Sequence, residues 1–137
     1  MATDLEEKDG IRETMARYCF YTDSGQSEKY AELFTEDCDW DGGPFGHCAG
    51  KAALLAMHQG GGDSATKLRH VNTNVVITVN GNEAQAISYV AVLGVGPQSP
   101  SLFFCGSYVD RLVKQGGRWL FKTRRIVTDL SMLKDLL

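Results

Sequence analysis

The chain has no long hydrophobic run and no concentration of positive charge. It has 137 residues, 43% of them hydrophobic, and its apolar runs fall well short of the roughly 20 residues that cross a bilayer. Its 14 lysines and arginines are scattered and are outnumbered by 17 acidic residues. We therefore expect neither a membrane nor a nucleic acid as a partner. The acidic stretch 1–10 also lacks the features of a signal peptide, which predicts a cytoplasmic protein.

Cysteine and histidine are both scarce. The four cysteines form no CxxC pair, so we expect free thiols. Cys38, His47 and Cys48 come close together in the chain, but a zinc site would need a second closely spaced pair of ligands. We therefore expect no metal site.

The length of 137 residues predicts one domain, residues 1–137. Hydrophobic periodicity predicts helices first and antiparallel hairpins after them. The predicted helices are a first one from Leu5 or Asp9 to Thr22, a short one over 28–34 with Ser27 as its N-cap, and one over 50–59. The predicted strands cover 37–42, 68–79, 83–95, 102–114 and 119–130. This order predicts an α+β fold in which helices cover one face of a curled sheet. The glycine-rich stretch 59–67 is a candidate mobile rim of a pocket.

One acidic residue continues an apolar row at the end of the first helix. Ile11, Met15 and Cys19 follow one another at a spacing of four, and Asp23 is the next member of that row. Burial and the negative end of the helix both disfavour a carboxylate at this position, so it needs a compensating partner. The alternative is a solvated turn residue, with Gly25 ending the helix.

His70 is the histidine predicted to lie inside a strand. An aspartate that accepts a hydrogen bond from one imidazole nitrogen orients the ring and makes the other nitrogen more basic. Asp23 and His70 are therefore a candidate general base. Tyr18, about one helical turn before Asp23, has a phenol that could donate to a substrate carbonyl or to a leaving hydroxyl. Tyr18 could equally be a core aromatic residue.

The face on which His70 lies is ambiguous. Strict alternation groups His70 with Asn72 on a polar row and places Val71, Val75 and Ile77 on the opposite, apolar row. A β-bulge or a polar cavity face would bring His70 to the core, and a solvent-facing row is the alternative.

The sequence also leads to predictions for two arginines and for a second histidine. Arg124 and Arg125 send their side chains to opposite faces of the last strand, so one of them turns inward, where it would pair with an acid such as Asp23 or with a substrate oxygen. We expect His58 to lie at the end of a helix and to have no chemical role.

These features in this order resemble the SnoaL-like branch of the NTF2-like superfamily. The likeness rests on the acid at the helix end, on "FTEDCDW" and "RHVNTNVVITVNG", and on the closing "GRWLFKTRRIV", and it runs over nearly the whole chain. It implies a cone-shaped α+β fold, with a curved mixed or antiparallel sheet packed on N-terminal helices around a deep apolar pocket. Members include scytalone dehydratase, bile acid 7α-dehydratase and hexachlorocyclohexane dehydrochlorinase.

The resemblance also implies roles for particular residues. In the bile acid dehydratase a tyrosine, a later aspartate on the same helix and a strand histidine form the active site, and Tyr18, Asp23 and His70 match that order. The dehydrochlorinase uses a similar dyad with an arginine on the last strand, at the position of Arg124. A homodimer or homotrimer is implied as well.

Together these arguments predict a cofactor-free lyase that acts on a small apolar hydroxy-carbonyl or polycyclic substrate. His70, oriented by Asp23, would remove a C–H proton while a hydroxyl leaves, with help from Tyr18 and an inward arginine. The candidate substrate-binding residues are Trp40, Phe34, Phe103, Phe104, Asn72 and Arg124. The alternatives are an isomerase or a hydrolase in the same pocket, and a non-catalytic domain that binds a small ligand or a partner.

Overall fold

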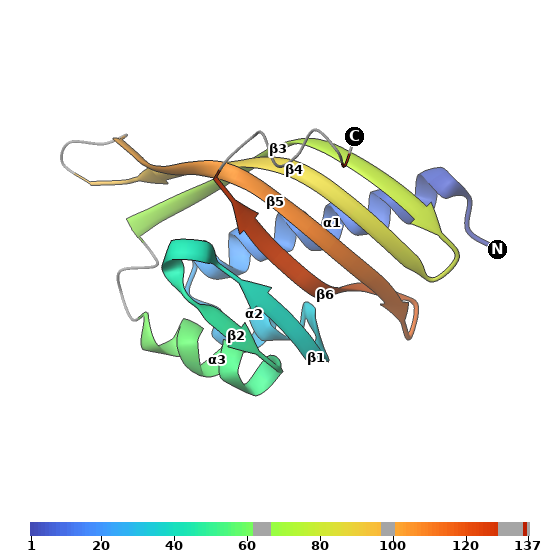
Figure 1. The fold of residues 1–137 in the computed structure, drawn as a ribbon, viewed down its shortest axis with the longest axis horizontal. Helices are drawn as coiled ribbons and strands as arrows, with labels where there is room; N and C mark the ends of the chain where they lie inside the picture. Colours follow the sequence, from blue (N-terminus) through green and yellow to red (C-terminus); the bar gives the residue numbers. More distant parts are fainter. Residues whose placement is uncertain (62–66, 97–100, 129–135, 137) are drawn as a thin grey trace.

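Helices dominate the first half of the chain and long strands the second half, in the computed structural model of the protein (Figure 1). The structure describes residues 1–61, 67–96, 101–128 and 136. The helical elements are α1 (Asp4–Asp23), α2 (Ser27–Ala31), the 3₁₀ turn η1 (Gly43–Phe45) and α3 (Lys51–Gly60). The strands are β1 (Phe34–Asp41), β2 (His47–Ala49), β3 (Leu68–Asn80), β4 (Glu83–Gly94), β5 (Ser101–Gln115) and β6 (Arg118–Val127). The predicted α+β class is confirmed.

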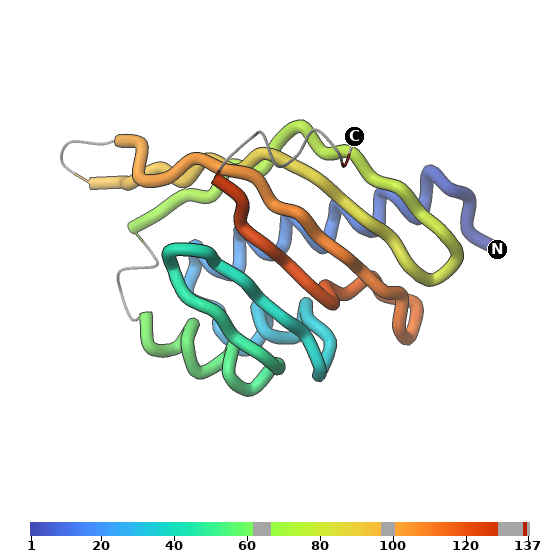
Figure 2. The backbone as a smooth tube through the Cα atoms, viewed as in Figure 1, coloured from blue at the N-terminus to red at the C-terminus, as the bar shows by residue number. Residues whose placement is uncertain are grey.

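The strands form one curved sheet in the order β2-β1-β6-β5-β4-β3. β1 runs parallel to β6, and the other neighbours are antiparallel. Figure 2 shows α1 lying along one face of this sheet, with α2 and α3 beside the β1 and β2 end. The helices therefore cover one face of the sheet, and the functional side chains described below lie between the two layers.

A capping box explains where α1 begins. The Thr3 hydroxyl accepts a hydrogen bond from the Glu6 backbone N–H, and the Glu6 carboxylate accepts one from the Thr3 N–H in return. This cap places the start one residue before Leu5, the earlier of the two predicted starts, and the helix runs through Gly10 without a break. The apolar row is buried as predicted, with Ile11 and Met15 in the core.

A bulge in β3 resolves the ambiguity over His70. The pairing of β3 with β4 shifts register between Thr73 and Val76, and Asn74 within this interval has a φ of 56°. Asparagine tolerates this left-handed conformation better than most residues. The extra residue reverses the alternation, so both His70 and Ile77 turn toward the helices although they are seven positions apart, which would place them on opposite faces of a regular strand.

One prediction about local structure is wrong, and two others fall outside the described residues. Ser27 is the first residue of α2, and its N-cap is Gln26, so the predicted capping role of Ser27 is wrong. The predicted pocket rim falls largely on residues 62–66, which lie outside the described residues, as does the predicted end of the last strand at 129–130. In the ranges that the structure describes, every helix is too short or too polar to cross a membrane.

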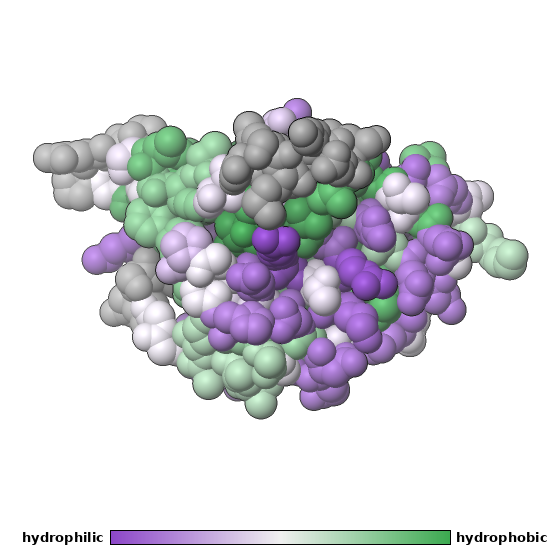
Figure 3. Space-filling model, viewed as in Figure 1, coloured by the Kyte–Doolittle hydropathy of each residue, from purple (hydrophilic) through white to green (hydrophobic). Residues whose placement is uncertain are grey.

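The face of the sheet that points away from α1 is mixed in character. Figure 3 shows hydrophilic side chains gathered over β1 and β6 and hydrophobic ones toward the end of the sheet where β5 begins. Val71, Val76 and Tyr89 are the exposed large apolar residues of β3 and β4, with about half of each residue accessible to solvent.

Candidate active site

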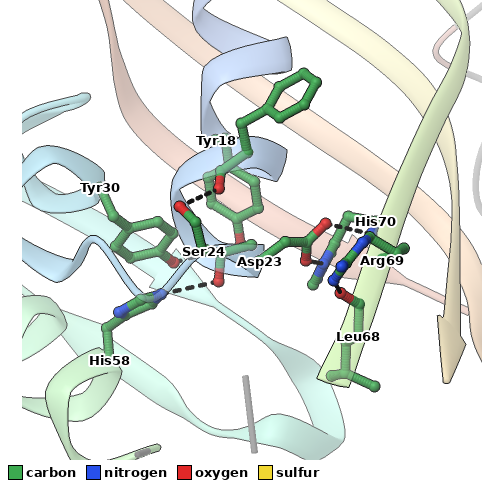
Figure 4. Close-up of polar contacts among 10 residues, drawn as sticks. Tyr18, Asp23, Ser24, Tyr30, His58, Leu68, Arg69 and His70 are labelled. Atoms are coloured by element: carbon green, nitrogen blue, oxygen red, sulfur yellow. Dashed lines mark hydrogen bonds and ion pairs between the residues drawn. The ribbon is translucent and has the colours of Figure 1, made fainter. Parts of the chain in front are cut away.

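The Asp23 carboxylate binds His70 through two hydrogen bonds (Figure 4). Its Oδ1 lies 2.6 Å from Nδ1 of the ring, and its Oδ2 accepts from the His70 backbone N–H at 2.8 Å. The two side chains are only 12% and 16% exposed. These contacts offset the cost of placing a carboxylate at the negative end of α1, which answers the question raised by the apolar row.

This contact decides the tautomer of His70. An ionised carboxylate only accepts hydrogen bonds, so Nδ1 carries the ring hydrogen and Nε2 keeps its lone pair. His70 lines a cavity between the sheet and the helices, and Nε2 is the ring nitrogen that a ligand there could reach. The pair has the geometry of a general base oriented by an acid.

The hydroxyl of Tyr18 lies in the same cavity wall. It accepts a hydrogen bond from Trp40 Nε1 at 3.2 Å and another from the Tyr30 hydroxyl at 3.4 Å. Because both neighbours donate to its oxygen, its own hydrogen is left available for another acceptor, and Tyr18 is among the residues that line the cavity. The Tyr18 and His70 rings meet edge to face, with centroids 6.4 Å apart. A candidate base and a candidate hydrogen-bond donor therefore lie next to each other in the cavity wall.

The cavity has a volume of about 420 Å³, and most of its wall is aromatic or aliphatic. Such a space suits a drug-sized apolar ligand that is oriented by a few polar groups. The lining residues are Tyr18, Thr22, Tyr30, Trp40, Phe45, Met57, His58, Gly61, Leu68, His70, Val92, Phe103, Phe104, Tyr108 and Ile126. No arginine, lysine or carboxylate is among these described residues.

His58 is a wall residue that the sequence analysis did not anticipate. It lies in the last turn of α3, as expected, but its ring stacks on Tyr30 with centroids 4.2 Å apart. Nε2 lies 2.9 Å from the Thr22 hydroxyl and Nδ1 lies 2.6 Å from the Ser27 hydroxyl. Burial and the nearby His70 ring lower the pKa of His58, which favours its neutral form. The feature of the sequence that indicates this place in the cavity wall is that His58 follows Met57 on the apolar face of the helix.

The inward arginine is Arg124, and its partner is Asp110. The side chains of both are fully buried, and Nε and Nη2 of Arg124 donate to the two Asp110 oxygens at 2.8 and 3.0 Å. Burial raises the pKa of the Asp110 carboxyl, and the adjacent guanidinium opposes that effect. The guanidinium also lies over the Tyr18 and Tyr108 rings, 4.2 and 3.6 Å from their centroids. The expected pairing of this arginine with Asp23 is wrong, because Asp110 stands directly opposite it on β5.

Arg124 therefore lies behind the cavity wall, where its charge acts on Tyr18 from beneath the ring. Its neighbour Arg125 points outward, with a half-exposed side chain 3.9 Å from Asp41.

The other predicted substrate-binding residues divide into two groups. Trp40, Phe103 and Phe104 line the cavity. Phe34 is fully buried and packs against the rings of Tyr18, Tyr30 and Phe121 in the core. Asn72 faces β4, where its amide donates to the Ser88 hydroxyl and to the Tyr89 carbonyl. Neither Phe34 nor Asn72 is among the residues that line the cavity.

The chain is similar to a known protein family and to a known protein. A profile of the SnoaL-like domain family matches residues 3–125. The small subunit of anthranilate 1,2-dioxygenase from Burkholderia cepacia is 25% identical over 145 aligned positions, which cover 88% of this chain and 86% of that protein.

Solved structures show the same fold. A Novosphingobium aromaticivorans protein named as a candidate scytalone dehydratase is 30% identical, with a TM-score of 0.81 over 92% of this chain and 86% of that one. An NTF2-like protein with a cystatin-like fold from the same organism is 25% identical, with a TM-score of 0.82 over 91% of this chain and 84% of that one. The expected NTF2-like architecture is thereby confirmed.

Proposed function

The chain belongs to the SnoaL-like domain family, and from that premise we propose that it is a cofactor-free lyase that removes water from a small apolar β-hydroxy carbonyl compound. The observation that carries this proposal is the Asp23 and His70 pair, held by two hydrogen bonds at the wall of an apolar cavity. The similarity to a candidate scytalone dehydratase supports the same class of reaction.

The proposed reaction uses two groups of the cavity wall. Nε2 of His70 takes a proton from the carbon next to the substrate carbonyl, and the Tyr18 hydroxyl donates a hydrogen bond to the enolate oxygen that forms. The enolate electrons then form the carbon–carbon double bond, and the β-hydroxyl leaves with a proton as water. Asp23 stabilises the imidazolium during this step.

The size of the catalytic effect restricts the substrate. A positioned general base contributes about 10²- to 10⁴-fold, so the C–H bond must already be acidic. A proton next to a ketone, on a ring that becomes aromatic after water is lost, meets this condition. A fused two- or three-ring compound would also suit a cavity of about 420 Å³ with aromatic walls.

The test uses 3-hydroxy-1-tetralone, a bicyclic β-hydroxy ketone that gives 1-naphthol when it loses water. We expect the wild-type protein to produce 1-naphthol above the spontaneous rate, and His70→Gln to lower kcat by about 10²-fold or more, because the base is removed. Mass spectrometry separates the alternatives, since an isomerase product keeps the mass of the ketone. Equal rates for the wild-type protein and His70→Gln would contradict the proposal.

A second candidate function follows from the similarity to a dioxygenase small subunit. In that case the chain would be a non-catalytic subunit, and its aromatic cavity would either bind a ligand or have no function. This candidate predicts no turnover of the ketone and stable association with the large subunit of a ring-hydroxylating dioxygenase, measured by co-purification. The lyase proposal predicts turnover by the isolated chain.

A further inference from the structure

His58 stands between two separate spaces of the molecule. On one side it lines the cavity that holds His70. On the other side it lines a surface groove of about 570 Å³. The other groove residues are Gly25, Gln26, Ser27, Glu28, Lys29 and Gln59. The imidazole ring is therefore part of the partition between the cavity and the outer surface.

Each ring nitrogen of His58 contacts a hydroxyl from a different side of this partition. Thr22, which lines the cavity, lies 2.9 Å from Nε2, and Ser27, which lines the groove, lies 2.6 Å from Nδ1. Stacking on Tyr30 fixes the plane of the ring, so both contacts are held at once. Figure 4 shows His58 on the opposite side of the end of α1 from His70, with Tyr18 and Asp23 between them.

The chemistry of these three groups permits proton transfer in either direction. A neutral imidazole has one N–H donor and one lone pair, and each hydroxyl can both donate and accept. Two arrangements of hydrogens are therefore possible along Thr22, His58 and Ser27. In one, each group donates its hydrogen bond toward the groove, and in the other, each group donates toward the cavity. A concerted shift converts one into the other and moves one proton from end to end. An imidazole that contacts hydroxyls at both nitrogens is better suited to this transfer than to direct attack on a C–H bond.

We propose that Thr22, His58 and Ser27 form a proton relay between the cavity and the surface groove. The relay rests on the proposed lyase function for its task, which is to supply the proton that the leaving hydroxyl needs. Thr22 gives its hydroxyl hydrogen to that oxygen and takes the Nε2 hydrogen of His58. Nδ1 of His58 takes the hydroxyl hydrogen of Ser27, and Ser27 takes one from water in the groove. One proton enters from the groove water, and each relay group ends with as many hydrogens as before, with the ring hydrogen of His58 now on Nδ1. The proton that His70 took from carbon returns to solvent and neutralises the hydroxide left in the groove, and the reverse shift along the relay restores His58 to its first tautomer.

The first measurement needs no substrate. In the full-length chain labelled with ¹⁵N, magnetisation transfer from water reports how fast the ring proton of His58 exchanges, and His58→Gln identifies its signal. We expect Ser27→Val to slow this exchange about tenfold, because the proton then reaches water only through local opening. Ser27→Thr retains the hydroxyl and should keep the wild-type rate. Ser24→Ala is the matched control, since Ser24 bonds Phe20 and Gln26 instead.

A wild-type exchange rate in Ser27→Val would overturn the relay. Ser27→Ala provides a second hydroxyl-free variant if valine disturbs the start of α2, and slow exchange in it would support the relay equally.

The second measurement uses turnover of 3-hydroxy-1-tetralone. Thr22→Val keeps the shape of the side chain but removes its hydroxyl, and we expect kcat to fall about tenfold while KM stays unchanged. Thr22→Ser should restore kcat. An unchanged kcat in Thr22→Val would overturn the role of the relay in the reaction. If the wild-type protein leaves the ketone intact, the proposed function fails, and the exchange measurement alone then decides the relay.

Discussion

Asp23 accepts hydrogen bonds from the ring and from the backbone of His70, at 2.6 and 2.8 Å. The end of α1 thereby fixes both the position of β3 and the orientation of the imidazole. A second pair, Asp39 and His47, has a similar 2.7 Å contact, but its His47 side chain is 59% exposed. The molecule therefore contains a buried Asp–His pair and an exposed one. Comparing matched variants of the two pairs shows whether activity depends on the pair in the cavity wall.

Asp23→Asn should preserve the shape of the site and abolish most of the lyase activity. The asparagine amide nitrogen would donate to Nδ1, which forces the ring hydrogen onto Nε2 and removes the lone pair that takes the substrate proton. We expect kcat for the tetralone to fall about 10²-fold or more. Asp39→Asn changes the same group in the exposed pair and should leave kcat unchanged. Normal turnover by Asp23→Asn would show that the dyad is not the base.

Tyr18→Phe tests the hydrogen-bond donor. The ring packing stays, but the Trp40 indole N–H and the Tyr30 hydroxyl lose their shared acceptor. We expect kcat to fall about tenfold to a hundredfold, and the free energy of unfolding to fall by about 1–3 kcal/mol, because buried polar groups are left unpaired. Tyr21→Phe is the control, since its hydroxyl accepts an exposed bond from Arg17. A loss of stability without a loss of kcat would restrict Tyr18 to a structural role.

Breaking the buried pair of Arg124 and Asp110 should destabilise the protein strongly. Arg124→Met leaves the Asp110 carboxylate buried without its partner, and we expect the free energy of unfolding to fall by about 3–5 kcal/mol in urea titrations. Replacing both residues, as Arg124→Met with Asp110→Leu, should recover much of this loss. Arg125→Met removes a half-exposed charge and should change stability by less than about 0.5 kcal/mol. Equal effects of the two single arginine variants would contradict this account.

The lowered pKa of His58 predicts a dependence of stability on pH. The folded protein keeps His58 neutral, whereas the unfolded chain protonates it near the ordinary value of about 6.5. The contribution is fully present above that value and is lost as the pH falls through the folded pKa of His58. We expect His58→Gln to show a smaller loss of unfolding free energy than the wild-type protein between pH 7 and 5. An unchanged pH profile in His58→Gln would show that burial does not hold this ring neutral.

The homodimer or homotrimer implied by the family resemblance stays a prediction. Val71, Val76 and Tyr89 are exposed on the face of the sheet that α1 does not cover, and we propose that a second copy of the chain covers them. Light scattering after size exclusion should give a mass above that of one chain. Val76→Lys should shift the protein to the monomer, because a lysine would be buried at the interface. A monomeric wild-type protein would contradict the proposal.

Much of the fold follows from patterns within the sequence. Periods of two and of about four residues predicted the strands and the helices, because each element must bury one face. The spacing of Ile11, Met15, Cys19 and Asp23 identified the helix face that carries the acid. The element boundaries and the strand register do not follow from these periods, since the capping box at Thr3 and the bulge at Asn74 depend on backbone geometry rather than on hydrophobicity.

The candidate site was likewise predicted only in part from the sequence. The sequence by itself determined that Asp23 continues an apolar row and that Tyr18 and His70 are candidates for its site, because local periodicity and residue chemistry carry that information. The contact between Asp23 and His70 spans 47 residues and depends on strand register. The tertiary structure alone decided this contact, the pairing of Arg124 with Asp110 and the place of His58 in the cavity wall. The contact of Asp23 with His70 and the place of His58 join segments that meet only after the sheet has packed against the helices, and no local pattern encodes such a meeting. The pairing of Arg124 with Asp110 depends instead on the register of the hairpin formed by β5 and β6.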